Sequence, residues 1–370
     1  MHSEGSGCRS LLIACSCVLV AYGLLILYSA AQPTTSAHRF AKQCYWLGVA
    51  CLFFLVFSKI NLLQLRAMGK WLGWITIGLL LLVFIPGFGH VVNGSRRWVG
   101  IGSVRMQPSE LAKIGFVLFL SYWITKNKQV RQNFIEDFVR PLSIVGFFCL
   151  LLLLEPDFGT ALLFGSVALL ALFVRGMPLR FIVPAVGLAI GLFAFLVYLN
   201  PVRFSRILSF LDLENTRMGT GYQLWQSLVA FASGKWFGRG LGLGHQQFFF
   251  LPEVHTDFIG AVLAEELGIV HVFVVLGCFA TIAFCGLKIT WQQDHPFLFY
   301  TGLTSVCFLT LQAFINLGVV TGLLPTKGMA LPFLSYGGSN LVANFSLVGL
   351  LVNLSYRRYP PIEAGGSCKQ

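Results

Sequence analysis

Acidic side chains that stand within or next to long apolar runs are the residues of this chain best suited to chemistry. Placing a carboxylate in a lipid bilayer costs roughly 2.5–3.5 kcal/mol on insertion scales, so such residues are functional candidates by default. Five carboxylates meet this description: Glu110, Glu155, Asp157, Glu253 and Asp257. They lie in three segments that are far apart in the chain.

Asp257 is the candidate catalytic residue. It opens an apolar run directly after a polar loop, in the sequence LPEVHTDFIGAVLAEELG of residues 251–268. On a helix, its face would carry small side chains, which leave room for a ligand. These residues are Ala261, Ala264 and Gly268. A carboxylate at such a boundary can act as a general base, but Asp257 is equally suited to cap the helix.

Two neighbours of Asp257 are further candidates. Glu253 could act as the base in its place, and His255 could orient Asp257 or a substrate. Both lie within four residues of Asp257, on the polar side of the same boundary.

A basic cluster precedes another apolar run, in NGSRRWVGIGSVRMQPSELAK (93–113). Glu110 and Lys113 are three residues apart, so they can pair on one helix face. Arg96 and Arg97 suit an anionic ligand such as pyrophosphate, because a guanidinium binds phosphate oxygens with a fork of donors. Anchoring to lipid phosphates or loop salt bridges explains these arginines equally well.

Two more segments interrupt apolar runs. In EPDFGT (155–160) the proline disfavours helix at Glu155, and Asp157 can cap the next span or pair with Lys113. Structural pairing is favoured there over direct catalysis. The segment TGLLPTKGMALPFLSYGGSN (321–340) cannot be a continuous helix, and irregular backbone at membrane depth is tolerated only where it is buried or lines a cavity. Its simplest interpretation is a rigid re-entrant loop without chemistry of its own.

The composition makes these segments parts of an integral membrane protein. Of the 370 residues, 56% are hydrophobic and 11% charged, whereas soluble domains average about 25% charged. Runs that approach the ~20 residues needed to cross a bilayer predict about ten spans. Their approximate bounds are 11–31, 43–58, 71–88, 108–125, 141–155, 159–175, 181–199, 257–288, 297–321 and 336–356. We therefore expect an all-α polytopic bundle that forms one domain over residues 1–370.

The distribution of Lys and Arg orients the bundle. An even number of spans puts both termini on one side, and the basic short loops place that side in the cytoplasm. The unusual polar segments then all face outward. They are 93–113, 155–160, 200–257 and 321–339. Because each joins two spans on the same face, we expect them to converge on one outward-facing site.

The extended outer loop, about residues 200–256, predicts surface helices rather than a soluble domain. From Pro201 to Asp212, polar residues recur every three positions with apolar residues between them. This pattern is typical of an amphipathic helix lying on a membrane. A second helix is predicted over residues 222–232, followed by glycine-rich turns.

Metal and nucleic-acid chemistry find no support in the sequence. Most of the ten cysteines lie inside apolar runs, and no Cys/His cluster has zinc spacing. The carboxylates define no ligand set, so the sequence assigns no metal ligands and no certain cofactor, and a dependence on a divalent cation stays open. The formal charge of +12 is spread over short loops, where it suits anionic membrane lipid rather than nucleic acid.

Four motifs in a fixed order resemble the SEDS family of RodA, FtsW and SpoVE. They are NGSRRW…QPSELAK, EPDFGTA, GYQLWQS…GLG…LPEVHTDFI…EELG and GLLPTKGMALPFLSYGGSN, and the match runs from the first span to Arg358. GYQLWQSLVAFASGKWFGRGLG and PTKGMALPFLSYGGSN resemble the division branch, FtsW, more than the elongation branch, RodA. Gly260 departs from the bulkier residue expected after HTDFI.

The resemblance implies a ten-helix fold with an outward cavity and a peptidoglycan glycosyltransferase activity. Such an enzyme polymerises lipid II into glycan strands for septal cell-wall synthesis. The acceptor's 4-hydroxyl attacks the anomeric carbon of the lipid-linked donor, and undecaprenyl diphosphate leaves. Asp257 would be the general base. Candidates to hold the diphosphate are Lys113, Arg96 and Arg97. Residues that would shape the charged cavity are Glu110, Glu155 and Asp157.

The resemblance also implies partners and a location. The partners would be a class B penicillin-binding protein, which supplies the transpeptidase, and other division proteins. The location would be the septum of the bacterial inner membrane. Other functions remain open: a lipid II flippase, an elongation-type glycosyltransferase of the RodA kind, or a scaffold of the division machinery.

Overall fold

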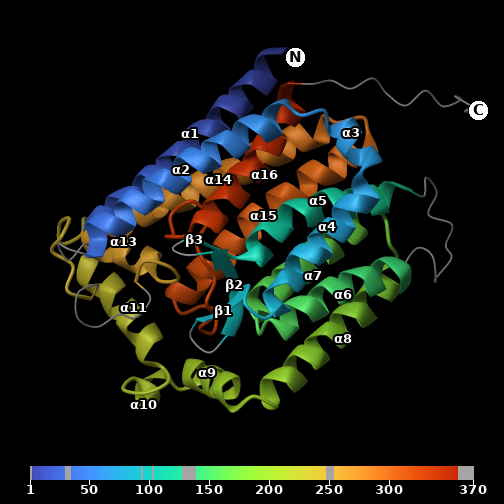
Figure 1. Cartoon of the computed structure of the whole chain (residues 1–370). Coiled ribbons are helices and arrows are strands. Elements are labelled where there is room, and N and C mark those ends of the chain that lie inside the picture. The colour runs from blue at the N-terminus through green and yellow to red at the C-terminus, as the bar shows by residue number, and fades with distance from the viewer. Residues whose placement is uncertain are drawn as a thin grey trace, which may run out of the picture.

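The computed structural model describes residues 2–29, 35–92, 95–101, 104–126, 139–246 and 254–356. They form a helical bundle with one small sheet (Figure 1). The helices are α1 (His2–Ser29), α2 (Thr35–Lys59), α3 (Leu62–Ala67), α4 (Gly69–Leu81), α5 (Pro108–Lys126), α6 (Arg140–Leu154), α7 (Phe158–Val174), α8 (Leu179–Tyr198), α9 (Pro201–Leu211), α10 (Leu213–Thr216), α11 (Tyr222–Gly234), α13 (Ile259–Leu267), α14 (Ile269–Trp291), α15 (Pro296–Val320) and α16 (Gly338–Tyr356). The 3-10 helix η1 (Leu82–Phe84) and the strands β1 (Gly89–Val92), β2 (Ser95–Ile101) and β3 (Val104–Met106) lie between α4 and α5.

The all-α membrane fold expected from the sequence is confirmed. Within the described chain, every predicted span contains a helix, and the two helices predicted in the outer loop are α9 and α11. On length and composition, 6 of the described helices can cross a membrane: α1, α2, α8, α14, α15 and α16. Shorter apolar helices accompany them, among them α6 and α7.

One predicted span is broken in the structure. The run 257–288 forms two helices, α13 and α14, which are separated at Gly268. Gly268 has a φ of 87°, and a Cβ at this position would lie 2.3 Å from the carbonyl oxygen of Trp236. Glycine is therefore required for its backbone conformation and for the close approach of the chain that follows α11.

The segment between α4 and α5 contains a small sheet that the sequence did not predict. β1 pairs with β2 and β2 with β3, both antiparallel, and α4 ends at Leu81 rather than continuing to residue 88. Strands this short, with 3 to 7 residues each, offer too few positions for a clear alternating pattern. The sheet carries Arg97 and Trp98 to the cavity described below.

α15 and α16 form the centre of the bundle. Buried polar side chains connect them to neighbouring elements by hydrogen bonds. In the most hydrophobic stretch of each helix, 72% of the residues of α15 and 83% of those of α16 are buried. Asn353 of α16 donates hydrogen bonds to the carbonyl oxygens of Phe57 and Ile60 at the end of α2, at 2.8 and 2.7 Å. Such bonds hold helices together where lipid offers no polar partner.

Lys113 of α5 is buried in this core with its charge paired. Its Nζ donates to Glu110 Oε2 at 2.7 Å and to Gln312 Oε1 of α15 at 2.6 Å. The predicted pairing of Glu110 with Lys113 is confirmed. The alternative pairing of Lys113 with Asp157 is wrong, because Asp157 accepts hydrogen bonds from Thr160 and Gln107 instead.

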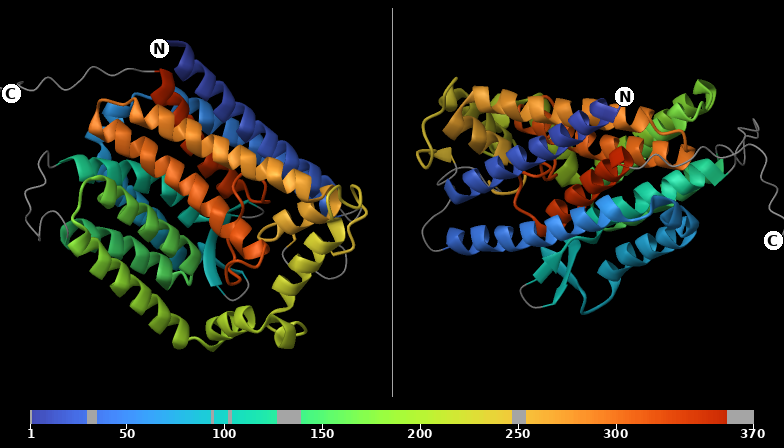
Figure 2. Two further views of the ribbon diagram at one scale, coloured as in Figure 1. Left: turned by 180° about the vertical axis from the view of Figure 1, so that it is seen from behind. Right: turned by 90° about the horizontal axis from the view of Figure 1, so that it is seen from above.

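The start of α1 and the end of α16 lie at the same end of the bundle. The guanidinium carbon of Arg9 is 4.0 Å from the ring centroid of Tyr356, as an even number of crossings requires. Along one edge of the bundle, α8, α9, α10 and α11 form an arc (Figures 1 and 2). The side of the membrane on which the termini lie stays a prediction.

The buried ion pair yields a stability prediction. Lys113→Met leaves the Glu110 carboxylate buried without its cation, and breaking such a pair costs about 3–5 kcal/mol. We expect a lower melting temperature in detergent for this variant, and partial recovery in the double variant Glu110→Gln/Lys113→Met. A double variant no more stable than the single one would contradict the pairing.

Candidate functional site

A cavity of about 710 Å³ lies where the predicted outward segments meet. Residues from all four segments form its wall, so the predicted convergence is present in the structure. The acidic residues on the wall are Glu110, Asp157 and Asp257. The basic residues on the wall are Arg97, Arg203, Arg206 and Lys327.

Asp257 lines this cavity from a turn and not from a helix. The turn spans residues 254–258, and α13 begins only at Ile259. The predicted helical face shared with Ala261 and Ala264 is therefore wrong. Phe258 takes the N-cap position, so Asp257 is not the capping residue, and its partly buried side chain lines the cavity.

An asparagine fixes the backbone of Asp257 against the loop that precedes α16. Asn316 Nδ2 donates to the carbonyl oxygen of Asp257 at 2.9 Å and to that of Met329 at 2.5 Å. Gly328 lies beside the carboxylate, since a Cβ built there would be 2.9 Å from Asp257 Oδ2. The carboxylate of Asp257 is thus in close contact with the loop backbone, and a larger residue at position 328 would have to displace it.

Two further hydrogen bonds join the same turn and loop. Ser335 Oγ donates to the carbonyl oxygen of Thr256 at 2.5 Å, and the Tyr336 amide donates to that of His255 at 2.8 Å. These bonds satisfy irregular backbone that lipid could not solvate. His255 therefore contributes through its main chain to the placement of Asp257.

Lys327 is the functional candidate that the sequence analysis missed. It lines the cavity, and its Nζ has no hydrogen-bond partner among the described residues. The Nζ lies 6.0 Å from the ring centroid of Phe193. Burial lowers the pKa of Lys327 to about 8. The negative charge of the neighbouring Asp157 acts in the opposite direction and raises this pKa. The signal that could have found it is a single cation inside irregular backbone at membrane depth.

The carboxylates of EPDFGT have different surroundings. Asp157 lines the cavity and caps α7, because its Oδ1 accepts from the Thr160 amide at 3.3 Å. The predicted cap is confirmed. Glu155 is fully buried behind the wall, and neither of its carboxylate oxygens has a hydrogen-bond partner among the described residues.

The arginines predicted to bind an anion are separated by the structure. Arg97 lines the cavity and donates to the carbonyl oxygens of Glu155 and Pro156, at 3.2 and 2.5 Å. Arg96 is exposed, and it is not part of the cavity wall. Lys113 does not line the cavity either and is held in its ion pair.

The remaining candidates concern Glu253 and metals. Glu253 lies outside the described residues. Among the side chains that the structure describes, no group of three His, Cys, Asp or Glu is placed to hold a metal ion. The charged groups of the site, in its described part, are therefore carboxylates and the side chains of arginine and lysine.

The sequence matches known proteins over nearly its whole length. A family model described as "Cell cycle protein", for FtsW, RodA and SpoVE, matches residues 9–359. The chain belongs to this family. A relative from Geobacter metallireducens, named "Probable peptidoglycan glycosyltransferase FtsW", is 38% identical over 92% of each chain. A relative of the same name from Legionella pneumophila is 38% identical over 85% of this chain and 80% of its own. The family resemblance stated from the motifs is confirmed.

Solved structures share the fold. A chain of a peptidoglycan synthase complex, studied for the coordination of polymerisation and crosslinking, superposes with a TM-score of 0.76 at 28% identity. The match covers 93% of this chain and 96% of that one. The rod shape determining protein RodA of Thermus thermophilus superposes with a TM-score of 0.70 at 27% identity, over 94% and 97% of the two chains. This chain is thus a multi-pass membrane protein of the same architecture.

The environment of Lys327 yields a titration prediction. Because burial lowers its pKa to about 8, the amine becomes neutral and nucleophilic as the pH rises through that value. Acetylation of Lys327, followed by mass spectrometry, should reach half its maximal rate near pH 8. Asp157→Asn should move this midpoint lower, because Asp157 favours the charged form. A midpoint near 10.5, the value of an exposed lysine, would contradict the burial of Nζ.

Proposed function

We propose that this chain is a peptidoglycan glycosyltransferase that polymerises lipid II during cell division, with Asp257 as its general base. The observation that carries the proposal is the Asp257 carboxylate on the cavity wall, fixed through Asn316 and placed against Gly328. The names of the relatives support the reaction, and the cell-cycle description of the family supports the division role.

The reaction uses the cavity residues as follows. Asp257 takes the proton of the acceptor's sugar hydroxyl as that oxygen forms a bond to the anomeric carbon of the donor. The bond from that carbon to the diphosphate oxygen breaks, and the diphosphate leaves with the electron pair. Asp257 then returns the proton to water. General-base catalysis of this kind contributes typically 10²–10⁴-fold.

Cations of the cavity stabilise the departing diphosphate. Lys327 is suited to this because its Nζ has no hydrogen-bond partner in the described chain and lies near the wall formed by Asp157. Arg97 retains the role predicted from the sequence, since it lines the same cavity. Lys113 and Glu110 instead stabilise the wall through their ion pair.

The partner and location follow from the same proposal. A class B penicillin-binding protein supplies the crosslinking activity, as the similarity to a chain of a peptidoglycan synthase complex supports. The protein works at the division septum of the bacterial inner membrane, with both termini in the cytoplasm. Lipid II enters from the outer leaflet, where its sugars meet the cavity.

A lipid II flippase is the second candidate, favoured by charges and broken helices at membrane depth. Purified protein with a class B partner and lipid II, without an energy source, discriminates the two. Glycan polymer identifies an enzyme, whereas transbilayer movement of lipid II without polymer identifies a transporter. Complementation of division-defective cells, but not of elongation-defective cells, distinguishes the FtsW role from the RodA role.

Replacing the base should abolish polymerisation. Asp257→Asn keeps the size of the side chain but cannot accept the proton, so we expect polymerisation to fall by about 10²–10⁴-fold. The measurement is glycan strand formation from lipid II, separated by gel. Unchanged melting temperature and partner binding would show that the loss is chemical. Polymerisation at the wild-type rate would refute the role of Asp257.

A methyl group beside the base should displace it. A Cβ at position 328 would lie 2.9 Å from Asp257 Oδ2, so Gly328→Ala should slow polymerisation by roughly 10–100-fold through misplacement of the carboxylate. Gly260→Ala is the matched control, because its Cβ would make an ordinary 3.4 Å contact with Val320. Equal activities of the two variants would show that the backbone at position 328 does not position Asp257.

A further inference from the structure

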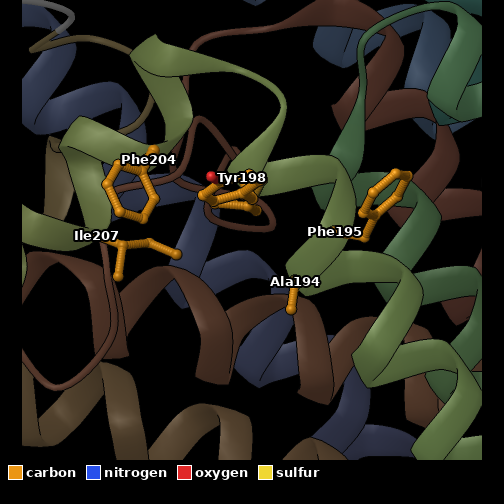
Figure 3. A pocket seen from close by; sticks show the side chains of 6 residues that line it. Ala194, Phe195, Tyr198, Phe204 and Ile207 are labelled. Atoms are coloured by element: carbon orange, nitrogen blue, oxygen red, sulfur yellow. The ribbon is translucent and has the colours of Figure 1, made fainter.

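A second, apolar groove lies beside the cavity, between the end of α8 and α9. Its volume is about 450 Å³, and aliphatic and aromatic side chains line it (Figure 3). The lining residues are Ala194, Phe195, Val197, Tyr198, Phe204 and Ile207. Only 11% of the residues in the most hydrophobic stretch of α8 are buried. This helix therefore presents most of its surface to lipid.

The groove and the polar cavity share a wall. Val197 of α8 and Ile207 of α9 line both of them. The two spaces, one polar and one apolar, are therefore adjacent at the junction between α8 and α9.

α9 presents different chemistry to each space. Arg203 and Arg206, three residues apart on one face of the helix, line the polar cavity. Phe204 and Ile207 line the apolar groove. The helix thus places cations and a hydrophobic surface within one turn of each other.

The cations of α9 have no acidic partner in the part of the chain that the structure describes. Among the described residues, neither Arg203 nor Arg206 has a carboxylate within ion-pair distance. The guanidinium of Arg203 lies 3.5 Å above the ring centroid of Phe158. Its pKa is lowered by burial first and then by Arg97 and Arg206. Clustered like charges of this kind favour an anion that bridges them.

We propose that α9 binds a polyprenyl diphosphate at the junction of its head and tail. Arg203 and Arg206 hold the diphosphate at the edge of the cavity, and the groove receives the first isoprene units. The rest of the chain then continues into lipid along α8. This inference rests on the proposed function and assigns the lipid of its substrate to a defined surface. Its cations, Arg203 and Arg206, line the same cavity as Arg97 but were not among the anion-binding residues predicted from the sequence.

The test is photocrosslinking of the full-length protein in phosphatidylcholine nanodiscs with a polyprenyl diphosphate that carries a diazirine on its first isoprene unit. We expect the label on peptides from α8 and α9 that contain groove residues, and competition by unlabelled undecaprenyl diphosphate. Label elsewhere would overturn the proposal. Equal competition by phosphatidylglycerol would also overturn it, because the groove would then be a general phospholipid site.

Variants separate the head from the tail. Arg203→Gln/Arg206→Gln should reduce labelling at least about tenfold, since both charge-assisted hydrogen bonds to the diphosphate are lost. Ala194→Trp fills the groove and should move the label out of it. The matched controls are Arg180→Gln at the other end of α8 and the lipid-exposed Leu188→Trp, which should label as wild type. Loss of label in the controls, or retention in the test variants, would contradict the assignment.

The photolabelling result does not depend on whether the protein polymerises lipid II. Glycan polymer from wild-type protein together with label outside the groove would overturn the lipid site and leave the proposed function intact. Label in the groove without any polymer, under conditions that include the class B partner, would support the lipid site and overturn the polymerase activity.

Discussion

The structure depends on satisfying backbone hydrogen bonds where the chain leaves helix inside a membrane protein. Lipid offers no partners, so each irregular segment must bond to protein or to water in a cavity. Asn316 meets this requirement for two segments at once, because it donates to the carbonyl oxygens of Asp257 and Met329. The turn that carries the carboxylate and the loop that carries Lys327 are thereby joined into one wall of the cavity.

The same constraint explains why some charged side chains contribute to stability and others line the cavity. Lys113 is surrounded by protein and has Glu110 as its ion-pair partner, so it contributes to stability. Lys327, Arg203 and Arg206 line the cavity without an ion-pair partner in the described chain. A net positive cavity next to an apolar groove suits a ligand with an anionic head and a hydrocarbon tail, which is the chemistry of a lipid-linked sugar.

Sequence reasoning succeeded where interactions are local in the chain. The pair Glu110–Lys113 and the cap at Asp157 depend on residues three apart, so helical periodicity was enough to predict them. Lys327 was missed because its place on the cavity wall beside Asp157 depends on tertiary packing. The spacing of residues in the sequence does not reveal such packing. The helical placement of Asp257 failed because tertiary hydrogen bonds hold its turn, and the break at Gly268 arose from the approach of distant backbone. The fold was predictable from hydropathy, whereas the composition of the cavity wall was not.

Cysteine accessibility at position 257 tests whether this side chain faces a water-filled cavity open to the outside. Asp257→Cys is introduced into a chain whose ten native cysteines are replaced, and intact spheroplasts are treated with a membrane-impermeant maleimide. We expect rapid labelling from outside that is slowed by undecaprenyl diphosphate. Labelling only after permeabilisation, or none in the folded protein, would place the residue on the cytoplasmic side or in lipid and contradict its role as the general base.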